Sequence, residues 1–105
     1  MNPDTLEFKF ENEKEKDGKR TFGKKETPWY KWTVYMNEDG EKLASVKYVE
    51  YRLHDTFPNP IRFSRDVKSK FALSSAGWGE FTIFITVYLN DGQEVETTHR
   101  LNLSM

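Results

Sequence analysis

Residues 74–89, SSAGWGEFTIFITVYL, decide the fold of this chain. A turn of small residues leads into the most regular strand pattern of the sequence. Every second residue there is apolar: Phe81, Ile83, Ile85, Val87 and Leu89. A period of two is typical of a β-strand with one buried face. Residues 79–89 are therefore expected to form a core strand of a sheet.

Trp78 stands between Gly77 and Gly79, directly before this strand. Glycine permits backbone turns that a Cβ forbids, and it lets another molecule approach closely. A Trp that cannot fold into the core from such a position is a candidate contact residue. The alternative is that Trp78 only caps the end of the fold, and these residues leave both interpretations open.

Composition bounds the class of protein. At 105 residues the chain is expected to be one domain, residues 1–105, and its net charge of -1 argues against a dedicated nucleic-acid or membrane surface. The absence of cysteine excludes disulfides and thiolate metal sites. No apolar run predicts a membrane span or a signal peptide, so we expect a soluble intracellular protein. An aromatic share of 15% favours an all-β fold.

The first third of the chain alternates between apolar and charged stretches. Residues 6–10 predict a short strand, whereas the charged residues 11–27 predict a solvated loop or a loose hairpin, with a turn at residues 16–19. Residues 28–36, PWYKWTVYM, predict a second strand in which Trp32 faces the core.

The third extended segment, residues 43–54, changes its apolar phase midway. One extra residue near Lys47, a β-bulge, explains the change. Two prolines in residues 54–60 forbid a regular ladder and predict a rigid loop. Further short strands are expected from Ile61 and from Phe71, a hairpin turn at residues 90–93, and a last strand at residues 95–103.

No segment predicts a helix, and about seven to eight short strands remain. Antiparallel strands in that number, with turns between them, predict an immunoglobulin-like β-sandwich of two sheets. An all-β barrel is the competing architecture.

Catalytic patterns are missing from the sequence. His54 and Asp55 are neighbours in an extended segment and therefore point to opposite faces, and His99 lies mid-strand as structural histidines do. No spacing resembles a metal site, and no glycine-rich phosphate loop opens a helix. We therefore expect a protein that is not an enzyme and that needs no cofactor or metal.

Two loops remain as a candidate site. One carries His54, Thr56 and Phe57, and the other carries residues 77–79. Loops at one end of a sandwich can converge, and Phe57 facing Trp78 makes a slot for a flat group.

These loops resemble those of the YEATS domain. HDTFPNP at residues 54–60, GWGEF at residues 77–81 and the strand YKWTVY at residues 30–35 follow the family's pattern in order, with the Gly-Trp-Gly-Glu-Phe form of the second loop. The resemblance covers roughly residues 29–103. It implies an immunoglobulin-like sandwich that recognises acylated lysine, crotonyl-lysine or acetyl-lysine.

By position, the resemblance also implies a role for each residue. Phe57 and Trp78 are the aromatic walls, Phe81 is the floor, and His54 supports the loop. The Thr56 hydroxyl accepts from the acyl amide.

The resemblance also implies that the backbone N–H of Trp78 or Gly79 donates to the acyl carbonyl. Gly77 belongs to the same binding loop. The family's further aromatic wall aligns on Pro28, so Trp29, one place away, is its expected substitute.

The charged segment at residues 11–27 matches nothing in the family's pattern, and the chain resembles a compact, prokaryotic member or an excised domain. The expected partner is an acylated lysine on a histone in a eukaryotic nucleus. In a prokaryotic cytoplasm it is another acylated protein or a small planar acyl ligand. The alternative function is a protein-interaction sandwich that uses a sheet edge or face.

Overall fold

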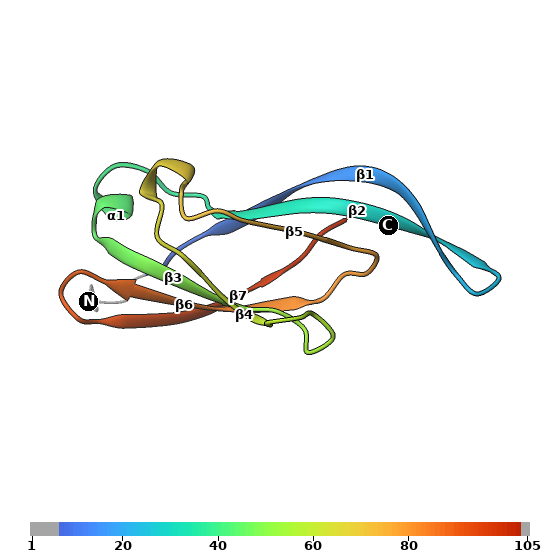
Figure 1. Cartoon of the computed structure of the whole chain (residues 1–105). Helices are drawn as coiled ribbons and strands as arrows, with labels where there is room; N and C mark the ends of the chain where they lie inside the picture. The colour runs from blue at the N-terminus through green and yellow to red at the C-terminus, as the bar shows by residue number, and fades with distance from the viewer. Residues whose placement is uncertain (1–6, 104–105) are drawn as a thin grey trace.

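The computed structural model of the protein describes residues 7–103. Its strands form two antiparallel sheets that pack face to face (Figure 1), in the orders β1-β2-β5 and β4-β3-β6-β7. The strands are β1 Phe10–Phe22, β2 Lys25–Met36, β3 Val46–Arg52, β4 Ile61–Ser64, β5 Leu73–Gly77, β6 Thr82–Leu89 and β7 Glu94–Arg100. This is the predicted immunoglobulin-like sandwich, and the two separate sheets exclude the barrel.

Alternating apolar residues of the central strands form the core between the sheets, because each strand turns every second side chain inward. The buried set includes Trp32, Val34 and Met36 of β2, Val49 and Tyr51 of β3, and Ile83, Ile85, Val87 and Leu89 of β6. The buried Tyr51 hydroxyl donates to the Phe71 carbonyl at 2.5 Å. Burial also raises the pKa of the Tyr51 phenol.

The charged residues 11–27 form a hairpin, which was one of the two predicted structures. The predicted position of its turn and the predicted strand before it were wrong. The expected strand at residues 6–10 is not where the first strand lies, because β1 begins at Phe10 and runs through the charged residues; Leu6 lies outside the described residues. The turn is Gly23-Lys24, with Gly23 at φ 65°, as a two-residue hairpin favours. The glycine expected in the turn, Gly18, instead lies in a register shift at φ 73°, typical of a β-bulge.

The structure also corrects the expectation of no helix. The five-residue α1, Gly40–Ala44, and a 3-10 turn, Val67–Ser69, connect strands at the end of the sandwich away from the β1–β2 tip (Figure 1). The strand expected from residue 43 therefore begins at Val46, and a register shift between Val46 and Tyr48 confirms the bulge.

Other predicted strand boundaries were wrong as well. Strand β6 begins at Thr82 rather than at residue 79, β2 begins at Lys25 rather than at residue 28, and β3 ends at Arg52 rather than at residue 54. Phe71 precedes β5 with a positive φ of 56°, whereas regular strand residues have a negative φ. The last strand ends at Arg100, and Leu101 and Leu103 continue into the core without ladder pairing.

A polar cluster fastens β1 of one sheet to β7 of the other. The Asn12 side chain pairs with the backbone of Asn102, its Nδ2 donating to the carbonyl at 2.9 Å and its Oδ1 accepting from the N–H at 3.0 Å. His99 Nε2 lies 2.7 Å from the same Oδ1, so Nε2 carries the proton and donates. Burial lowers the pKa of His99, and nearby Glu11 partly opposes that shift.

Candidate functional site

The loop between β3 and β4 is held closed by hydrogen bonds. Leu53 N–H donates to the Pro60 carbonyl at 2.7 Å, across the base of the loop. The Arg62 side chain donates to the carbonyls of Pro58 and Asn59, each at 3.0 Å. The loop is thus fixed by hydrogen bonds between the protein's own groups.

His54 and Thr56 set each other's hydrogen-bonding roles in this loop. The Thr56 N–H donates to His54 Nδ1 at 3.2 Å, so Nδ1 is unprotonated and the ring proton sits on Nε2. The Thr56 hydroxyl lies 3.0 Å from the same Nδ1 and can only donate to it. Both lone pairs of the hydroxyl oxygen therefore remain as acceptors, and Thr56 is exposed.

The second loop connects β5 to β6 through Trp78, whose side chain is 56% exposed and so does not belong to the core. Glu80 Oε2 accepts from the Leu103 N–H at 2.7 Å, and the Phe81 carbonyl accepts from the Leu101 N–H at 2.9 Å. The segment that follows β7 thus holds this loop in place.

The prediction that Gly77 and Gly79 serve backbone turns that a Cβ would forbid was wrong. Neither Gly77 nor Gly79 has a positive φ, and Gly77 is the last residue of β5. A Cβ at Gly77 would lie 3.7 Å from Phe57 Cζ, an ordinary contact, and a Cβ at Gly79 would meet nothing within 4 Å. The two glycines instead leave space in the cavity, which larger side chains at these positions would fill.

Both loops line one cavity of about 460 Å³ at the end of the sandwich. All eight residues singled out from the sequence line it: Trp29, His54, Thr56, Phe57, Gly77, Trp78, Gly79 and Phe81. Ala76 and Glu80 also line it and were missed, although they flank the Gly-Trp-Gly stretch directly. Two loops, strand β2 and the end of β5 therefore contribute to one site.

Aromatic rings make the base of the cavity. The Phe57 and Phe81 rings are 5.2 Å apart, and both meet the buried Trp32 ring edge-on, at 6.3 and 6.1 Å. His54 approaches Phe81 at 6.3 Å. Because Trp32 is only 2% exposed, the Phe57 and Phe81 rings rest on the core and have little freedom to move.

Trp29 is half-buried and directly precedes Tyr30–Val34, the segment of β2 that pairs with β5. The Arg20 guanidinium lies over its indole, 5.1 Å from the ring centroid. That cation–π contact orients the indole from the β1 side.

The lining offers apolar rings and hydrogen-bonding groups. Among residues 7–103, no three His, Asp or Glu side chains gather as metal ligands would. Nor does any helix in that range combine the length and apolar character that crossing a bilayer requires. The ionisable side chains that line the cavity are His54 and Glu80.

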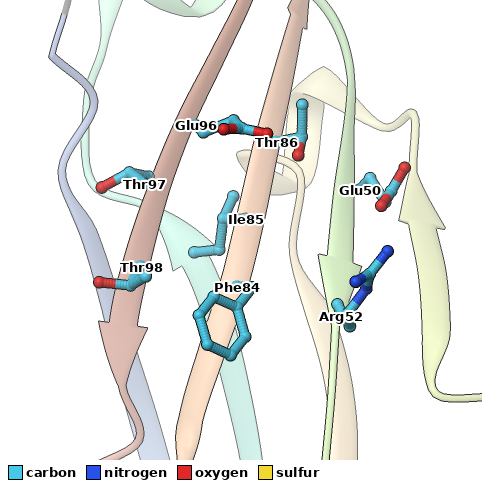
Figure 2. A pocket seen from close by; sticks show the side chains of 8 residues that line it. All are labelled: Glu50, Arg52, Phe84, Ile85, Thr86, Glu96, Thr97 and Thr98. Carbon is cyan, nitrogen blue, oxygen red and sulfur yellow. The ribbon is translucent and has the colours of Figure 1, made fainter.

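A second hollow, of about 350 Å³, lies on the outer face of the four-stranded sheet. Figure 2 shows the Phe84 ring on β6, with Arg52 and Glu50 on one neighbouring strand and Thr98 on the other. The Phe84 side chain is 58% exposed. Charged and hydroxyl groups surround this hollow, whereas four aromatic side chains line the end cavity.

The fold and the cavity together define an immunoglobulin-like β-sandwich with an aromatic-lined cavity between end loops. A sequence model of the prokaryotic YEATS domain matches residues 30–102 of the chain. The chain belongs to the YEATS family.

Curated relatives share part of their length with this chain. The protein AF-9 homolog of Saccharomyces cerevisiae is 38% identical over 79 residues, 69% of this chain and 33% of that protein. Transcription initiation factor TFIID subunit 14 of Schizosaccharomyces pombe is 39% identical over 77 residues, 70% of this chain and 31% of that protein. The chain thus spans about a third of the length of these relatives.

Solved YEATS structures share the fold. The crystal structure of the yeast AF-9 homolog Yaf9 superposes with a TM-score of 0.70 at 33% identity, covering 91% of this chain and 66% of that one. The Yaf9 YEATS domain recognising an H3K122suc peptide gives a TM-score of 0.68 at 30% identity, covering 95% and 79%. The Yaf9 domain bound to H3K27ac gives 0.67 at 28%, covering 96% and 79%. Structural neighbours of this chain thus bind acylated histone peptides.

Proposed function

We propose that this protein binds an acylated lysine in the end cavity, with a preference for a flat acyl group such as crotonyl. One observation carries the proposal: the cavity joins the rings of Trp29, Phe57, Trp78 and Phe81 to a hydroxyl acceptor on Thr56. An acylated lysine presents the matching chemistry, a neutral side chain that ends in an amide and an apolar group.

The free energy of transfer favours the acylated side chain over free lysine. Acylation removes the ammonium charge, so the side chain enters an apolar cavity without the cost of burying an ion. A conjugated crotonyl group stacks on aromatic faces, at about 1 kcal/mol per ring beyond burial. The amide N–H donates to the Thr56 hydroxyl, which adds about 1 kcal/mol net. After association costs, we expect a Kd of roughly tens of micromolar to millimolar.

Calorimetric titration with one peptide sequence in four forms tests the proposal. The lysine is crotonylated, butyrylated, acetylated or unmodified. Crotonyl and butyryl chains have equal length, so tighter binding of crotonyl isolates the contribution of planarity. We expect no binding of the unmodified peptide, and weaker crotonyl binding by Thr56→Val, which keeps the side-chain volume but removes the acceptor. Equal heats from unmodified and crotonylated peptides refute the proposal.

The alternative, a sandwich that holds a protein partner on a sheet face, has one observation in its favour. Three large apolar side chains on the outer face of the four-stranded sheet are about half exposed: Ile61, Phe63 and Phe84. If that face carries the function, Phe84→Ser abolishes partner capture and pocket variants leave it intact. The acyl-lysine proposal predicts the reverse.

A further inference from the structure

The β1–β2 hairpin continues beyond the sandwich as a two-stranded ribbon. Strand β5 pairs with β2 only over Tyr30–Val34, so residues 17–29 have no third strand beside them. In Figure 1 this ribbon extends past the end of the sandwich where the β3–β4 and β5–β6 loops lie. A ribbon without a third strand buries little of its own surface, so its stability alone gives no reason for this length.

The ribbon is basic in a chain whose net charge is -1. It contains four basic and two acidic side chains. Both carboxylates are engaged, Glu26 with Lys19 at 3.5 Å and Asp17 with Arg20 at 3.3 Å. Lys24 and Lys25, at the tip, are exposed and form no ion pair with the described residues. The positive charge that is left for a partner therefore lies at the tip.

The ribbon is physically continuous with the pocket. Trp29 lines the cavity and is covered on one side by Arg20 of the ribbon. Side chains alternate along β2, so Lys25, Thr27 and Trp29 share one face. At about 3.3 Å per residue, the Lys25 backbone lies about 13 Å from that of Trp29, which is four residues of an extended peptide.

We propose that the ribbon selects acylated lysines that have acidic residues about three to five positions away along the same chain. The inference rests on the proposed function, because the pocket must first hold the acyl group. An acidic protein segment fits better than nucleic acid for two reasons. The only basic side chains of the ribbon outside the ion pairs of the described residues are Lys24 and Lys25, and they lie within a few peptide residues of an apolar pocket.

Three crotonyl-lysine peptides with glutamate, serine or lysine at the flanking positions test this inference, each beside its unmodified form. We expect the glutamate peptide to bind about two- to fivefold more tightly than the serine peptide, and the lysine peptide more weakly than both. The differences should shrink between about 50 mM and about 500 mM salt, because the screening length falls below the distance involved.

The double variant Lys24→Glu and Lys25→Glu should reverse the order of the three peptides. Its control, Lys47→Glu with Lys68→Glu, makes the same charge change at exposed lysines that do not line the pocket and should preserve the order. Thermal melts verify that both double variants fold.

The outcomes separate the two proposals. If all three crotonylated peptides bind equally, the inference about the ribbon is overturned while acyl-lysine binding stands. If crotonylation gives no binding in any of them, the proposed function fails and the inference fails with it. If a short DNA duplex binds through Lys24 and Lys25 and the peptides are not discriminated, the ribbon recognises nucleic acid and the inference is overturned.

Discussion

Replacing Trp78 by alanine is expected to weaken binding of a crotonyl-lysine peptide about 50-fold and to leave the stability of the protein nearly unchanged. The side chain is 56% exposed, so its removal opens no cavity in the core. Exposed positions of this kind usually change the free energy of unfolding by less than about 0.5 kcal/mol.

The loss of binding follows from the area that the indole offers to the ligand. A tryptophan side chain presents about 200 Å², so roughly 100 Å² is accessible here and a flat ligand covers about half of that. About 50 Å² at 25 cal/mol per Å² gives about 1.3 kcal/mol, and stacking adds about 1 kcal/mol. The sum of about 2.3 kcal/mol corresponds to a Kd about 50 times higher.

Phe84→Ala is the matched control, because Phe84 is 58% exposed but lies on the outer face of the four-stranded sheet. Calorimetric titration measures the affinity of each variant, and thermal unfolding measures its stability. The reasoning is refuted if Trp78→Ala binds as the unchanged protein does, or if Phe84→Ala loses as much affinity as Trp78→Ala.

Three further changes test other parts of the structure. The pKa of His99 is lowered by burial, so the unfolded chain takes up the proton first and the free energy of unfolding should fall as the pH drops below the ordinary value of 6.5; His99→Gln should remove that dependence in urea titrations across pH, and an unchanged pH profile would contradict it. Tyr51→Phe leaves the Phe71 carbonyl without its buried donor and should cost about 1–2 kcal/mol of stability in urea unfolding, with no effect on peptide affinity. Gly79→Ala should fold normally, because an added Cβ meets nothing, yet weaken crotonyl-lysine binding by filling the mouth of the pocket; a large loss of melting temperature would show that the glycine serves the backbone instead.

The sequence predicted the parts of the fold that have one buried face. Strands β2 and β6 and the bulge after Val46 were visible because alternation records which side chains enter the core. Strand β1 could not be predicted in this way, because most of its residues are exposed on both faces. Its backbone hydrogen bonds to β2 do not depend on residue type, so the composition does not reveal them. Helix α1 has five residues, none of them buried, so no apolar periodicity predicts it.

The site was predictable for a different reason. Alternation says nothing about which loops meet. The residues alone offered the loop from His54 to Phe57 and the loop at residues 77–79 as candidates, and the resemblance added Trp29 and Phe81 to the same site. Their hydrogen-bonding roles needed coordinates, since the acceptor state of the Thr56 hydroxyl depends on the proton position in its neighbour's ring. The glycine conformations were misjudged because the amino acid type shows what is permitted rather than what is adopted.

The hydrogen bonds from Arg62 to the carbonyls of Pro58 and Asn59 should affect the rate of ligand binding to the pocket. A recognition loop that is already in its final shape has no slow closing step, so encounter and release follow diffusion and contact strength alone. For the acyl-lysine binding proposed above, this predicts that a peptide both associates and dissociates rapidly.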